Sequence, residues 1–79
     1  MINDIISKNV KSSKVIIVNK VEDIDNIIID LNNNIPLIVN LMNINKRSAY
    51  RIVDFLSGYC YAKKGKYRKI DKLIYRFEI

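Results

Sequence analysis

The chain has no histidine or tryptophan, and only one cysteine, one proline and two glycines among its 79 residues. The lack of histidine excludes His-based catalytic sites and Cys/His zinc sites, and a single cysteine cannot form an intramolecular disulfide. Gly58 and Gly65 are too few for a phosphate-cradling glycine-rich loop, and no apolar run approaches the ~20 residues that span a bilayer. We therefore expect no enzyme, metal or cofactor, and the lone Cys60 fits a reducing cytoplasm.

The chain is rich in apolar and basic residues. Hydrophobic residues make up 49% of the sequence, which is too apolar for disorder and more than one small domain easily buries. Fourteen Lys and Arg against eight Asp and Glu give a net charge of +6, which favours acidic partners. The charge is uneven, because residues 1–40 carry four basic and five acidic side chains, whereas residues 41–79 carry ten and three.

The first half of the chain predicts a strand, a helix and a second strand. Residues 1–13 are predicted to be an N-terminal tail or a short amphipathic segment. The β-branched run 14–18 predicts a strand, and the run 37–41 predicts another. A helix is expected over 21–31, because four apolar residues recur there at helical spacing: Ile24, Ile27, Ile28 and Leu31.

A second helix is expected to start after Asn43 or Asn45, either of which can cap it. It has one apolar stripe, made of Ala49, Ile52, Val53, Leu56 and Cys60. The helix ends at Gly58, leaving a strand over 59–62, or it runs on to residue 63 or 64 and Gly65 ends it. The stripe favours the longer helix, in which Gly58 costs about 1 kcal/mol relative to alanine. Gly58 and Ala62 then form a small-xxx-small pair that permits close approach of another helix.

Two final strands, over 66–70 and 73–79, flank a turn around Asp71 and Lys72. A two-residue loop puts Lys69 on the face opposite Tyr75, whereas a three-residue loop puts Lys69 directly across from Tyr75 and Tyr67 across from Phe77. The residues alone leave both registers open.

The element order is β-α-β-α-β-β, which predicts an α/β, two-layer sandwich over residues 14–79. Right-handed crossovers place both helices on one face of a mixed sheet. The first two strands are apolar at nearly every position, as though buried on both faces, yet no element remains to cover the second face. An exposed apolar sheet face marks an interface, so we expect a homodimer packed sheet to sheet.

Basic and aromatic residues are interleaved near the end of the chain. The basic ones are Lys63, Lys64, Lys66, Arg68, Lys69, Lys72 and Arg76; the aromatic ones are Tyr59, Tyr61, Tyr67, Tyr75 and Phe77. This composition suits RNA or single-stranded DNA, an acidic and partly apolar peptide, or a solvated basic face with no specific role.

The run RIVDFLSG at residues 51–58, followed by Tyr61-Ala62 and Gly65-Lys66, resembles the core of SepF, a bacterial cell-division protein family. Segments 12–15 and 36–41 and the pair Lys69-Ile70 fit the same pattern, so the resemblance covers about residues 12–77. It implies a small α/β domain that dimerises, polymerises, binds the C-terminal tail of the division GTPase FtsZ and tethers it to the membrane.

The resemblance also implies functional positions. Those matching Ala49, Lys69 and Tyr75 are associated with FtsZ-tail binding, and we expect Arg51 to complement acidic groups of the tail. The glycine matching Gly58 lies at a helix-to-helix contact used in polymerisation. We expect Phe55 and Ala62 to share that contact.

The chain departs from the family at several positions. Tyr75 replaces a usual Phe, and Lys64 and Asp71 stand where glycine is common. Family members carry an amphipathic membrane helix and a long acidic linker, whereas about ten residues stand there in this sequence, which puts direct membrane tethering in doubt. The sequence thus predicts a non-enzymatic division adaptor, cytoplasmic and at the division site. The alternative is a small basic nucleic-acid-binding dimer of the Alba type, which shares the element order and the charge.

Overall fold

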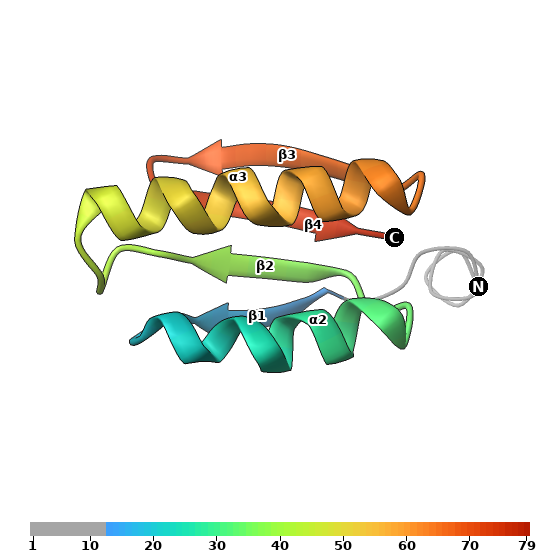
Figure 1. Cartoon of the computed structure of the whole chain (residues 1–79), viewed down its shortest axis with the longest axis horizontal. Coiled ribbons are helices and arrows are strands. Elements are labelled where there is room, and N and C mark those ends of the chain that lie inside the picture. The colour runs from blue at the N-terminus through green and yellow to red at the C-terminus, as the bar shows by residue number, and fades with distance from the viewer. Residues whose placement is uncertain (1–12) are drawn as a thin grey trace, which may run out of the picture.

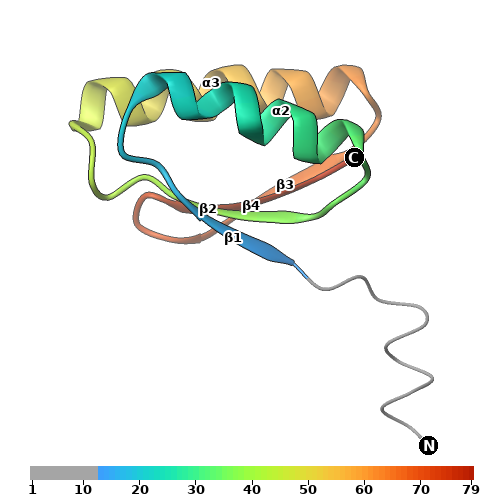
Figure 2. The same ribbon diagram turned by 90° about the horizontal axis from the view of Figure 1, so that it is seen from below.

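The computed structural model describes residues 13–79, so all of the expected N-terminal tail except Ser13 lies outside the described residues. Its elements are β1 (Lys14–Ile17), the 3₁₀-helix η1 (Val21–Asp23), α2 (Ile24–Asn32), β2 (Leu37–Asn40), α3 (Lys46–Ala62), β3 (Lys66–Asp71) and β4 (Ile74–Glu78). The strands form one sheet in the order β1-β2-β4-β3, with β1 and β2 parallel and the other pairs antiparallel. Both helices lie on one face of this mixed sheet, which confirms the predicted α/β sandwich (Figure 1, Figure 2).

The core lies between the helices and the sheet. All five residues of the predicted apolar stripe on α3 are buried, as are Ile27 and Leu31 of α2, while Ile24 and Ile28 pack partly buried against them. Cys60 is fully enclosed, and its burial raises the pKa of the thiol, which agrees with a structural rather than a reactive cysteine.

The ends of α3 follow the sequence with one correction. Asn45 caps the helix by accepting a hydrogen bond from the Ser48 amide at 2.8 Å, and Gly58 lies inside the helix, which confirms the longer alternative. At the other end the Gly65 amide donates to the Cys60 carbonyl (2.7 Å) and the Lys64 amide donates to the Tyr61 carbonyl (3.0 Å). These bonds form a Schellman motif.

Gly65 was expected to end the helix, but Lys64 takes the left-handed conformation there, with φ 60°. Gly65 is required for a different reason. A Cβ at that position would run into the backbone of β4 at Glu78 and the Cα of Ile79 (2.8 Å).

Lys64→Gly is expected to stabilise the domain by about 1 kcal/mol, because glycine adopts positive φ without the penalty that lysine pays there. In thermal unfolding this corresponds to a midpoint roughly 4–8 °C higher for a domain of this size. Lys63→Gly is the matched control, since Lys63 has φ −90° and gains nothing from glycine. A midpoint that falls in both variants would contradict the strain at Lys64.

The hairpin adopts the register predicted for a three-residue loop. Lys69 lies opposite Tyr75 and Tyr67 lies opposite Phe77, and the ladder then shifts by a bulge between Lys69 and Asp71. The turn is centred one residue later than predicted, because Leu73 has φ 57° and its carbonyl accepts a hydrogen bond from the Leu41 amide at 2.8 Å. Leu73 is therefore a turn residue and not the start of β4.

Strand pairing places side chains in rows that cross the sheet. One row, on the face under the helices, runs Ile16, Val39, Tyr75, Lys69. A neighbouring row, on the face without helices, runs Val15, Ile38, Arg76, Arg68. We call the side without helices the open face. Its row is apolar on β1 and β2 and basic on β4 and β3, so the open face has an apolar half and a basic half.

Candidate partner-binding surfaces

A second line of residues runs along the outer surface of α3, on the side away from the buried apolar residues: Arg51, Phe55, Gly58 and Ala62. We call this exposed line the α3 stripe. Their spacing of three and four residues puts them on one side of the helix. Gly58 and Ala62 are exposed and Phe55 is 51% exposed. Among the described residues, nothing outside the local helix backbone comes within 4 Å of a Cβ placed on Gly58. The chain's own packing therefore does not require glycine at this position.

Arg51 belongs to this outer side of α3. It lines a groove of about 300 Å³ between η1, α2 and α3, together with Val21, Ile24, Ser48, Ile52 and Phe55. The structure does not bring Arg51 together with Lys69 and Tyr75, which lie on β3 and β4. The groove could not be predicted from the sequence, because its shape depends on how α2 and α3 lie side by side.

Lys69 and Tyr75 form a cross-strand pair on the helix side of the sheet. Lys69 is exposed, whereas Tyr75 is only 8% exposed and its ring stacks on Phe77 with centroids 6.2 Å apart. No buried side-chain oxygen or nitrogen lacks a partner among the described residues. Ala49 is fully buried in the same core, so it can affect this surface only through packing.

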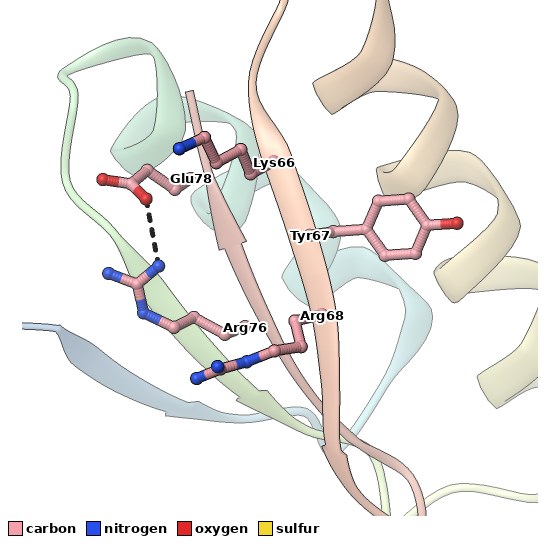
Figure 3. Close-up of a pocket in the computed structure, with 5 residues that line it drawn as sticks. All are labelled: Lys66, Tyr67, Arg68, Arg76 and Glu78. Carbon is pink, nitrogen blue, oxygen red and sulfur yellow. Dashed lines mark hydrogen bonds and ion pairs between the residues drawn. The ribbon is translucent and has the colours of Figure 1, made fainter.

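The open face has an apolar half and a basic half. Val15 and Ile17 of β1 are 62% and 52% exposed, and Ile38 of β2 is partly exposed beside them. The other half carries a groove of about 380 Å³ along β3 and β4, lined by Lys66, Tyr67, Arg68, Arg76 and Glu78 (Figure 3). The expected uncovered apolar face is therefore present, but it covers only the β1 and β2 side.

The interleaved aromatic residues are mostly engaged inside the domain. Tyr59 stacks on Phe55 and donates a 2.6 Å hydrogen bond to Asn32, Tyr67 stacks on Phe77, and Tyr75 is buried. Tyr61 and Tyr67 are the exposed members of the set, at 84% and 52%. The two exposed rings lie on α3 and β3, and the other three are buried or half-buried.

Known proteins with similar sequences share one name. The family model described as cell division protein SepF matches residues 14–77. The chain belongs to the SepF family. A SepF protein from Thermoanaerobacter sp. (strain X514) is 45% identical over 56 residues, which are 71% of this chain and 41% of that relative.

Two further SepF relatives show similar agreement. The one from Desulfitobacterium hafniense (strain Y51) is 45% identical over 56 residues, covering 71% of this chain and 37% of the relative. The one from Ruminiclostridium cellulolyticum is 42% identical over 53 residues, covering 67% and 34%. The chain thus spans well under half the length of the SepF relatives it matches. Within the part that the structure describes, no helix is long and apolar enough to cross a membrane.

Proposed function

We propose that this chain is a non-enzymatic SepF-type adaptor that binds the C-terminal tail of FtsZ, self-associates and supports Z-ring and septum assembly in the cytoplasm at the division site. The observation that carries the proposal is the SepF match across residues 14–77, which includes the hairpin and all of α3. The surfaces described above supply a physical role for each step.

Self-association uses two separate surfaces. The apolar half of the open face is the dimer contact, because burying exposed Val15 and Ile17 against a second copy removes apolar surface from water. The α3 stripe is the contact between dimers, because exposed Gly58 lets another helix approach its backbone closely. Since α3 and the open face lie on opposite sides of the sheet, one copy can use both contacts at once (Figure 2).

The FtsZ tail binds beside the exposed side of the Lys69–Tyr75 pair. The tail's acidic groups meet Lys69, and its apolar groups lie against the small exposed part of Tyr75, which is 8% exposed. The Tyr75→Ala variant cannot test this placement, because removing a buried aromatic ring costs about 3–5 kcal/mol of stability. The test therefore rests on Lys69.

Lys69→Glu is expected to weaken binding of an FtsZ tail peptide about tenfold, because it replaces an attractive charge with a repulsive one at the contact. The measurement is isothermal titration of the peptide against each variant at fixed salt. Lys72→Glu is the matched control, since it makes the same charge reversal in the adjacent turn and should change affinity by less than about twofold. If both variants lost peptide affinity equally, the effect of Lys69→Glu would come from net charge alone, and this would contradict the placement of the tail beside Lys69.

A further inference from the structure

The basic half of the open face adjoins an unpaired strand. β3 is at the end of the sheet order, so one side of its backbone has no neighbouring strand among residues 13–79. All six of its residues are exposed. An exposed edge of this kind offers a row of free N–H and C=O groups to another extended chain.

Two arginines meet directly across β3 and β4. Arg68 lies opposite Arg76 in the ladder, and like charges in such a pair are destabilising. Figure 3 shows both side chains on the same side of the hairpin. The fold does not need this pair of like charges, because a neutral residue at either position would remove the repulsion.

Arg76 is held in place, and Arg68 is not. Arg76 donates to Glu78 at 3.0 Å and to the Ser13 hydroxyl at 3.3 Å. Glu78, the residue across from Lys66, pairs with Arg76 instead. Within the described part of the chain, Arg68 and Lys66 have no acidic partner. Arg68 therefore lies beside a fixed like charge on the open face, with its own charge uncompensated (Figure 3).

The groove favours carboxylates on a peptide over a nucleic acid. Tyr67 points to the other side of β3 from the two arginines, so no aromatic ring stands beside them to stack with a base (Figure 3). An extended peptide can instead place an acidic residue at every second position and still pair its backbone with β3.

We propose that β3 is a docking edge for an acidic, extended segment of a partner protein, which adds to the sheet as a further strand over Lys66–Lys69. Alternate acidic side chains of that segment lie beside Lys66 and Arg68 on the open face. The bulge after Lys69 sets the end of the paired stretch. This site uses the open face and the free edge of β3, whereas the FtsZ-tail contact at Tyr75 lies on the helix side. The two sites share Lys69, which pairs with Tyr75. The edge site stands whether or not the tail contact exists.

The test uses three capped seven-residue peptides: one alternating Thr and Glu, one alternating Thr and Lys, and one alternating Pro and Glu. Chemical shifts and hydrogen exchange of the backbone amides in the full chain are measured during each titration. We expect the Thr/Glu peptide alone to shift the β3 amides and slow their exchange. The Pro/Glu peptide carries the same charge but cannot pair as a strand, so it should bind at least tenfold more weakly.

Arg68→Glu should weaken Thr/Glu binding at least tenfold without lowering the unfolding midpoint, because it also removes the like-charge pair. Arg47→Glu makes the same charge change on exposed α3 and should leave binding unchanged. Equal binding of the Pro/Glu peptide would overturn the proposal. Tighter binding of a single-stranded oligonucleotide or of inorganic phosphate at Lys66 and Arg68 would also overturn it.

Discussion

Replacing Gly58 with lysine is expected to abolish assembly beyond the dimer while making the domain more stable. Gly58 lies on the exposed α3 stripe, where an added Cβ has nothing within 4 Å among the described residues beyond the local helix, so the fold accepts a side chain there. Lysine is also the better helix former by about 0.7 kcal/mol. A second helix approaching the same surface would meet a long charged side chain, and close backbone contact would be lost.

Light scattering and electron microscopy of assemblies, together with thermal unfolding, measure both parts of the Gly58→Lys prediction. Gly58→Ala should raise stability by about 1 kcal/mol but only weaken assembly, since a methyl group is a small obstruction. Asn26→Lys adds the same charge to exposed α2 and should change neither assembly nor size. If the Gly58→Lys variant still formed polymers, Gly58 would have no role in assembly, and the proposal that the α3 stripe is the contact between dimers would be wrong.

Ile17→Asp is expected to convert the proposed dimer to a monomer at micromolar concentration. Ile17 is 52% exposed on the apolar half of the open face, so the substitution places a carboxylate where the proposed partner surface is apolar. Burying an unpaired charge costs at least about 3 kcal/mol, which is a hundredfold or greater loss in dimer affinity. The fold should survive, because an exposed position on an edge strand contributes less than about 1 kcal/mol through its β-propensity.

Sedimentation velocity distinguishes the two states of the Ile17→Asp variant. Ile29→Asp is the matched control, since Ile29 is 57% exposed on α2 and lies away from the open face. That variant should remain a dimer. A wild-type chain that sediments as a stable monomer would contradict the sheet-to-sheet contact from the start.

Patterns along a single element were predictable from sequence, because each depends on that element alone. The helical spacing of the apolar residues from Ala49 to Cys60 identified the buried face of α3. Because this spacing continues to Cys60, it also predicted correctly that the helix extends beyond Gly58. The β-branched run of β1 predicted a strand with apolar residues on both faces, and Val15 and Ile17 are indeed exposed opposite the core.

Relations between elements were not predictable in the same way. The residues alone left the hairpin register open. The bulge between Lys69 and Asp71 shifts the strand pairing, and no glycine or proline at that point indicates a bulge in the sequence. Arg51 was grouped with Lys69 by charge, yet the direction of α3 turns it toward α2. Arg68 and Arg76 were counted only as part of a basic run, although they lie opposite each other on β3 and β4.

The positive backbone angles of Lys64 and Leu73 show a related limit. Both residues occupy turn positions where glycine would be the expected choice, and the bonds to Tyr61 and Leu41 hold them there. Sequence reasoning places positive φ at glycine and asparagine, so it put the end of α3 at Gly65. The close contact between Gly65 and β4 shows that this glycine serves packing instead.

Co-sedimentation with FtsZ polymers tests the adaptor proposal most directly. The chain should pellet with polymers of full-length FtsZ and remain in the supernatant with FtsZ that lacks its C-terminal tail, at the same salt concentration and in the presence of competing duplex DNA. Equal pelleting with both forms of FtsZ, or loss of pelleting when DNA is added, would contradict tail recognition and favour a general affinity for acidic polymers.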